Sequence, residues 1–194
     1  MSPAEGAGRR LSLAALVFGL LAVGAPSLSG AAGESRAPRV CRASQLAVSV
    51  GLDLSLPTGR RAFSLRLRNR GPTCRSDGYP ELTLLDRRRE VLPIEVRQGG
   101  GMMVGSQPPR PVVVRPGGVA WIVFEQYRCD LGGGRAVGTA LVRLPRTTEA
   151  LRLRFAPGRE ELHFCGKGDP GSTVFVSPVV RTQRAALHVY GRGP

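Results

Sequence analysis

The feature of this sequence that most constrains its fold is a strict alternation of apolar with polar or small side chains over residues 46–56. Leucine or valine occupies every even position in this segment, and the odd positions hold Ala47, Ser49, Gly51, Asp53 and Ser55. Because successive side chains of a strand point to opposite faces, the pattern predicts a half-buried β-strand. Residues 57–59 (Pro-Thr-Gly) mark a turn, and residues 63–68 alternate again. The two segments are therefore predicted to form a hairpin.

The rest of the chain continues this pattern in shorter segments separated by turn residues. Further predicted strands are Glu81–Leu85, Val91–Val96, Val112–Arg115, Val119–Tyr127, Val137–Leu144, Leu151–Phe155, Glu161–Cys165 and Thr173–Ser177. Residues 34–194 contain no segment with convincing helical spacing, so the sequence predicts an all-β antiparallel sandwich of about seven to nine strands. The Gly-rich and Pro-rich segment Gln98–Pro111 is predicted to be a long flexible loop. Residues 181–194 are predicted to be a C-terminal tail or an edge strand containing Leu187, Val189 and Tyr190.

The N-terminus has the order of a secretory signal. Arg9 and Arg10 precede an apolar run, Leu11–Gly24, which is followed by small residues as far as Gly33. At about 14 residues this run is shorter than the roughly 20 needed to cross a membrane. We therefore predict a signal peptide over residues 1–33, a short linker over residues 34–40 and a sandwich domain over residues 41–180. Retention of the apolar segment as a membrane anchor is the alternative. The expected location after cleavage is secreted or in the extracellular cell envelope.

Export determines the interpretation of the four cysteines, Cys41, Cys74, Cys129 and Cys165. An even number of cysteines without a C-x-x-C motif favours two disulfides over a zinc site. Three connectivities are open. The pairs Cys41–Cys74 and Cys129–Cys165 are preferred because each then closes a loop between neighbouring strands.

The composition is that of a globular and strongly basic protein. Apolar residues make up 42% of the 194 residues, which excludes disorder of the whole chain, and 28 Lys plus Arg against 14 Asp plus Glu give a net charge of +14. Such a surface attracts anions. Aromatic residues are only 5% and do not interleave with the arginines, and there is no zinc-finger spacing or basic helix. Specific nucleic-acid recognition is therefore not expected.

Two predicted strands carry arginines on the side opposite their apolar residues. Arg66 and Arg68 alternate with leucines in one strand, and Arg152 and Arg154 do so in another. If these strands lie in the same sheet, the four arginines form one basic stripe. Our hypothesis is that this stripe binds an anionic cell-wall polymer, an anionic lipid or an acidic protein partner; dispersed solubilising charge is the competing interpretation.

Several segments together resemble a known family. They are Cys41–Leu46, Leu67–Gly71, Thr73–Cys74 with Gly78-Tyr79-Pro80, and Arg115–Ala120. Over about residues 40 to 179 the chain is similar to an exported family of high-GC Gram-positive bacteria, domain of unknown function 4232. The resemblance implies an immunoglobulin-like β-sandwich that is secreted or associated with the envelope, and it implies no activity. Ser76 departs from the pattern, because a large apolar residue is expected two places after Cys74.

Candidate chemistry in the sequence is weak. His163 and Cys165 would share a strand face, and with Met102 and Met103 they suggest a copper site, but nothing local fixes their geometry. No Gly-x-Ser-x-Gly motif occurs, the consecutive Glu160 and Glu161 would point to opposite faces, and Gly132–Arg135 lacks the phosphate-loop pattern. We therefore assign no catalytic residue, metal ligand or cofactor, and expect a non-catalytic binding module. The alternatives are a secreted hydrolase or copper-binding protein and a structural envelope component.

Overall fold

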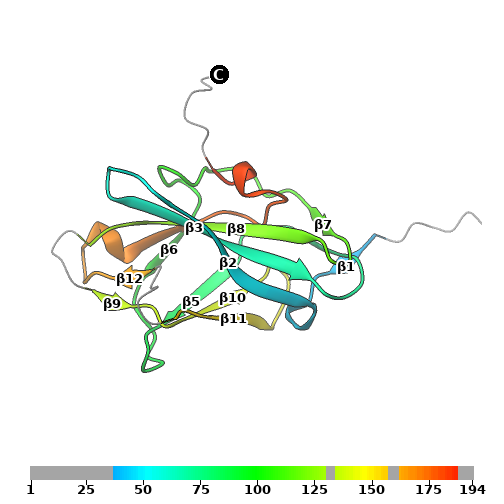
Figure 1. Cartoon of the computed structure of the whole chain (residues 1–194), viewed down its shortest axis with the longest axis horizontal. Coiled ribbons are helices and arrows are strands. Elements are labelled where there is room, and N and C mark those ends of the chain that lie inside the picture. Colours follow the sequence, from blue (N-terminus) through cyan, green and yellow to red (C-terminus); the bar gives the residue numbers. More distant parts are fainter. Residues whose placement is uncertain (1–36, 130–133, 157–161, 188–194) are drawn as a thin grey trace, which may run out of the picture. The chain divides into compact units, whose positions relative to one another are not determined.

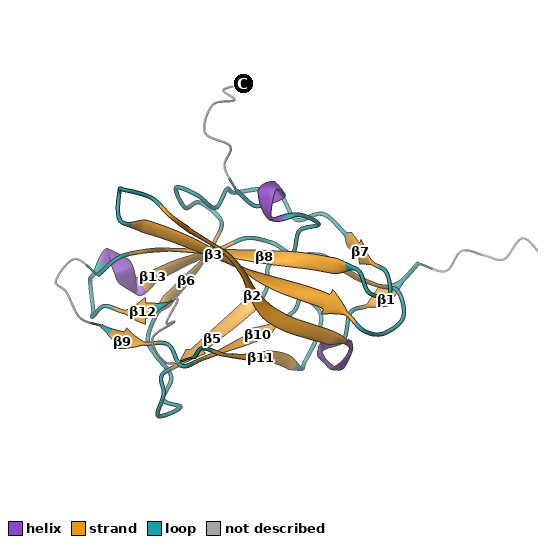
Figure 2. Cartoon of the chain, in the orientation of Figure 1, coloured by secondary structure: helices purple, strands orange, loops and turns teal. Residues whose placement is uncertain are grey.

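Two sheets face each other across an apolar core (Figures 1 and 2). The computed structural model describes residues 37–129, 134–156 and 162–187. The larger sheet has the order β2 (Leu46–Ser55), β3 (Arg60–Asn69), β8 (Val119–Tyr127), β13 (Thr173–Val176) and β6 (Glu95–Gln98). The smaller sheet has the order β11 (Ala150–Arg154), β10 (Thr139–Arg143) and β5 (Glu81–Leu85). The predicted all-β sandwich is confirmed. The predicted signal peptide lies outside the described residues.

The predicted hairpin is the β2–β3 pair, in which Val48 lies opposite Leu67 and Val50 opposite Leu65. The inward side chains of β3, Phe63, Leu65 and Leu67, are all buried. The ring of Phe63 stacks on that of Phe124 of β8, with a centroid distance of 5.1 Å, and meets the ring of Phe155, just after β11, edge to face at 6.2 Å. The contact between Phe63 and Phe155 joins the two sheets. Burying one such side chain stabilises the fold by about 1.5–3 kcal/mol.

Both preferred disulfides form, and each stabilises one of two additional short sheets at the ends of the sandwich strands. Cys41–Cys74, with a Cα–Cα distance of 4.8 Å, links the sheet formed by β1 (Arg39–Val40), β4 (Cys74–Ser76) and β7 (Val112–Val114) to the adjoining 3-10 helix η1 (Ala43–Gln45). Cys129–Cys165, with a Cα–Cα distance of 5.1 Å, ties the end of β8 to the pair β9 (Arg135–Ala136) and β12 (His163–Phe164). The helix η2 (Pro170–Ser172) follows β12.

The predicted strand Val91–Val96 is largely wrong. Strand β6 begins only at Glu95 and pairs in parallel with β13, so this edge of the sheet is not antiparallel. Proline has no N–H to contribute to a ladder, and Pro93 lies between the isolated bridge at Val91 and the start of β6. The strand therefore starts after the proline.

The outer face of the five-stranded sheet carries a second apolar cluster. Its buried members are Ala62, Met103, Val104, Val123, Val180 and Ala186. The segment Gln98–Pro111 and residues 177–187, which include the helix η3 (Gln183–Ala185), cross this face and are joined by a bridge between Val104 and Leu187. The middle of the predicted flexible loop is thus part of a core, because the outward side chains of β3 and β8 give it apolar surface to cover. Of the predicted edge-strand residues, Val189 and Tyr190 lie outside the described residues.

Candidate functional site

The four arginines predicted to form one stripe lie in two different sheets. Arg66 and Arg68 are on β3 of the five-stranded sheet, whereas Arg152 and Arg154 are on β11 of the three-stranded sheet. All four side chains are exposed and point away from the core, as predicted. Because the inner faces of the two sheets share one core, their outer faces point in opposite directions. The prediction of a single stripe is therefore wrong.

Arg66 and Arg68 are instead joined by two arginines of the C-terminal segment. Arg66 lies opposite Trp121 in the β3–β8 register, and Trp121 forms a bridge with Val180. From Val180 the chain turns back over the sheet, where the side-chain nitrogen of Gln183 donates a hydrogen bond to the hydroxyl of Ser64 at 2.5 Å. This contact is two residues from Arg66 on the same face of β3.

Arg181 and Arg184 belong to the same turn as Gln183, which contacts this face, and both are exposed. We call Arg66, Arg68, Arg181 and Arg184 the outer-face arginines. Arg181 and Arg184 were not predicted, because they follow the last regular strand, where alternation gives no signal.

The positive charge of the outer-face arginines is not neutralised locally. Within the described part of the chain none of the four forms an ion pair. In the described strands of this sheet, two acids lie on this face: Glu125 is fully buried, and Glu95 is on the edge strand β6, three strands from β3, where it pairs with Arg97 at 2.9 Å. On the opposite sheet, Arg152 and Arg154 likewise form no ion pair with a described residue, and Arg143 on the neighbouring strand β10 is paired with Glu81. The outer face therefore holds the larger uncompensated charge.

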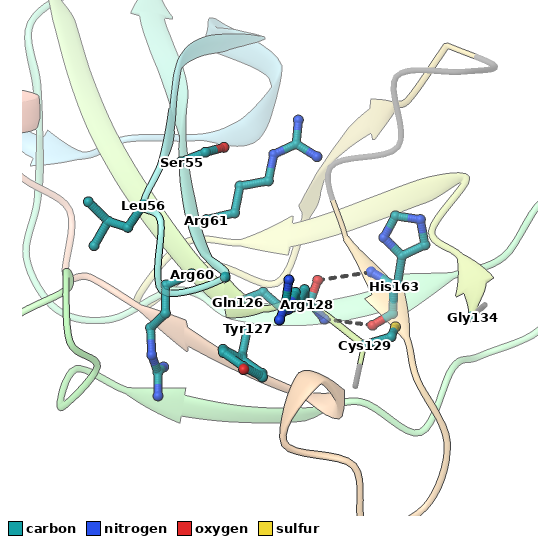
Figure 3. Close-up of a pocket in the computed structure, with 11 residues that line it drawn as sticks. Ser55, Leu56, Arg60, Arg61, Gln126, Tyr127, Arg128, Cys129, Gly134 and His163 are labelled. Carbon is teal, nitrogen blue, oxygen red and sulfur yellow. Dashed lines mark hydrogen bonds between the residues drawn. The ribbon is translucent and has the colours of Figure 1, made fainter. Parts of the chain in front are cut away.

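A pocket of about 590 Å³ lies at the other end of β3, beside the β2–β3 turn (Figure 3). Arg60, Arg61 and Arg128 line it, and no acidic residue of the described chain does. Two of these cations already have carboxylate partners. Arg61 donates two hydrogen bonds to Asp53, at 3.0 and 2.6 Å, and holds the pKa of Asp53 below its usual value. Figure 3 also shows Arg60 and Arg61 pointing in opposite directions, so the arginines do not converge on one ligand position.

The partner of Arg60 is a buried carboxylate, Glu125, which was not among the predicted site residues. Glu125 is fully buried, and its Oε1 accepts hydrogen bonds from Arg60 Nη1 and the Met102 N–H, both at 3.0 Å. Its Oε2 accepts from the N–H groups of Met103 at 2.7 Å and Val104 at 2.8 Å. A glutamate within the apolar run of β8 was the available signal. Its role is structural, because it accepts hydrogen bonds from the N–H groups of residues 102–104 in the loop that covers the outer face.

His163 lines the same pocket, and its backbone is held by Gln126 of β8. The His163 N–H donates to Oε1 of Gln126 at 3.0 Å, and Nε2 of Gln126 donates to the His163 carbonyl at 2.6 Å (Figure 3). Burial of the ring, with a smaller contribution from the charge of Arg61, lowers the pKa of His163. The shift favours the neutral form of the imidazole at pH 7.

The residues suggested as copper ligands are not brought together. The sulfur of Cys165 is in the disulfide with Cys129, and Met103 packs in the second apolar cluster, to which His163 does not belong. No group of three or more His, Cys, Asp or Glu side chains in the described residues is placed to hold a metal ion. Glu160, Glu161 and residues 132–133 of the Gly132–Arg135 segment lie outside the described residues.

Ser76, which departs from the expected pattern, is buried in β4, and its hydroxyl has no hydrogen-bond partner in the described structure. Ser76 lies opposite Val112, a residue of the apolar core, so this chain places a hydroxyl at a buried position beside the core.

Together these features define a small disulfide-linked β-sandwich with a cationic outer face. The family model described as domain of unknown function 4232 matches residues 41–180, and the chain belongs to this family. Neither the curated proteins nor the solved structures include a significant match to the chain.

Proposed function

We propose that this protein is an exported, non-catalytic module that binds an anionic polymer of the cell envelope on the outer face of its five-stranded sheet. The observation that carries the proposal is the set of four outer-face arginines, which have no ion-pair partner among the described residues. Guanidinium groups suit this role because they stay charged and bind phosphate or carboxylate through two parallel hydrogen bonds.

The arrangement of these arginines favours a polymer over a single small anion. Arg66 and Arg68 are two residues apart on one face of β3, so their Cα atoms are about 7 Å apart. Arg181 and Arg184 extend the charged area across the sheet. Charges spread over an open surface contact a chain of repeated anionic groups at several points, and each contact adds to the affinity.

The proposed export is supported by the two disulfides, which persist in oxidising compartments outside the cytosol. Among the described residues no helix is long and apolar enough to cross a membrane.

The test uses two pairs of substitutions that change the charge equally on opposite sheets. One variant carries Arg66→Glu and Arg68→Glu, and the matched control carries Arg152→Glu and Arg154→Glu, in the same alternating pattern with leucine. Binding of the purified protein to teichoic acid, a poly(glycerol phosphate), is measured at several salt concentrations. If each contact contributes about −0.7 to the slope of log K against log salt, as for single-stranded nucleic acids, four contacts give about −3.

We expect the β3 variant to lose most of the binding and to have a slope no steeper than about −1.4, because at most two contacts remain. The β11 control should keep a slope near that of the unmodified protein. Equal loss in the two variants would mean that net charge alone attracts the polymer. Binding by neither the unmodified protein nor the control would also refute the proposal, and an acidic protein would then be the next partner to test.

A further inference from the structure

A depression of about 560 Å³ lies beside β1, at the end of the sandwich closed by the Cys41–Cys74 disulfide. Pro38, Val40 and Pro72 give it apolar lining, and Arg39 and Arg42 supply two positive charges. None of the described residues that line it is acidic. The depression therefore combines apolar surface with a cationic border.

The walls of this depression are fixed by covalent and hydrogen bonds. Cys41 and Cys74 are both buried, and β1 pairs with β4 directly before the disulfide. The side-chain nitrogen of Gln45 donates to Asn69 Oδ1 and to the Pro72 carbonyl, both at 3.1 Å. A pocket held in this way loses little conformational entropy when it binds a ligand.

Arg39 and Arg42 are exposed and form no ion pair with any described residue. The same segment borders a smaller depression of about 350 Å³, which Glu149 lines, but neither arginine is within ion-pair distance of that carboxylate. Their charge is therefore available to a ligand on the side lined by Pro38 and Pro72.

We infer that this depression binds a small amphiphilic anion. A single phosphate or carboxylate group would lie between Arg39 and Arg42, and its apolar body would pack on Pro38, Val40 and Pro72. Charge complementarity selects the anionic group, and removal of the apolar body from water adds to the affinity. The site shares no residue with the outer-face arginines, so it is independent of the proposed polymer binding.

The experiment titrates the protein with hexyl phosphate, inorganic phosphate and hexanol, and follows backbone amide resonances. We expect hexyl phosphate to bind at least tenfold more tightly than either of the other two probes, with the largest shifts at Val40 and Thr73. Hexanoate should bind at the same place, which would show that the site recognises a carboxylate as well as a phosphate.

The variants distinguish this site from the outer face. The double substitution Arg39→Gln and Arg42→Gln should weaken hexyl phosphate binding tenfold or more, whereas Arg66→Gln with Arg68→Gln should leave it unchanged. Both pairs are exposed, and unchanged thermal unfolding confirms that the variants fold. Equal affinity for hexyl phosphate and inorganic phosphate, or insensitivity to the Arg39/Arg42 substitution, would overturn the inference. Neither result would affect the teichoic acid test.

Discussion

Replacing the buried Glu125 with glutamine should destabilise the protein more than any exposed charge change. The carboxylate accepts four hydrogen bonds, two at each oxygen, from Arg60 and from the N–H groups of residues 102–104. A glutamine keeps one oxygen, which can still accept from Met103 and Val104. Its NH₂ group then faces the Met102 N–H and Arg60, which are both donors. Two hydrogen bonds are lost.

The magnitude follows from these two losses. An unsatisfied backbone donor costs about 1–3 kcal/mol, and breaking a buried ion pair costs about 3–5 kcal/mol. The side chain of Arg60 is 25% exposed and can partly rehydrate, so we take the lower limit of each range. We expect Glu125→Gln to reduce the free energy of unfolding by about 4 kcal/mol, the sum of the two lower limits.

Urea denaturation measures this change, and Glu95→Gln is the matched control. Glu95 is paired with Arg97, but both side chains are more than half exposed. The same substitution there should leave the midpoint almost unchanged, because exposed ion pairs contribute little. Amide hydrogen exchange at residues 102–104 should also accelerate in Glu125→Gln. Unfolding of the two variants at the same urea concentration would show that the four hydrogen bonds of Glu125 do not stabilise the fold as described.

Three further outcomes are expected. Ser76→Ala should raise the free energy of unfolding by about 1 kcal/mol, because it removes a buried hydroxyl that has no hydrogen-bond partner in the described structure. Ser177→Ala should lower the free energy of unfolding by a similar amount, because the Ser177 hydroxyl accepts from the Val123 N–H and donates to the Pro178 carbonyl. Urea midpoints of the two variants that move in the same direction would contradict this. Gly101→Ala should destabilise the loop, since a Cβ there would overlap the Glu125 carboxylate, and a thermal midpoint equal to that of the unmodified protein would argue against the close packing. The pKa of His163 is lowered from its usual 6.5 in the folded protein, so near and below pH 6.5 the unfolded chain binds more protons than the folded chain. The free energy of unfolding should therefore decline as the pH falls from 7 towards 5. Thermal unfolding curves recorded at a series of pH values should show that His163→Gln removes this part of the decline.

The elements that sequence reasoning predicted well are those with local signals. Strands β5 and β8 have the predicted bounds, Glu81–Leu85 and Val119–Tyr127, and the β2–β3 hairpin follows from alternation and a three-residue turn. Alternation of period two fixes which side chains point inward, whatever the partner strand is. The preferred disulfide pairing is also confirmed, although only Cys41–Cys74 joins neighbouring strands, β1 and β4, whereas Cys129–Cys165 connects two different sheets.

Sequence by itself therefore determined that Arg66 and Arg68 point outward, and likewise Arg152 and Arg154. Only the tertiary structure decided that the two pairs lie on opposite sheets, because sheet membership depends on pairing between segments far apart in the chain. The same non-local folding brings Arg181 and Arg184 over β3 and buries Glu125 beneath residues 102–104. No periodicity within a strand encodes these contacts, since the groups that form them are separated by about 20 to 120 residues and meet only when the sheets have assembled.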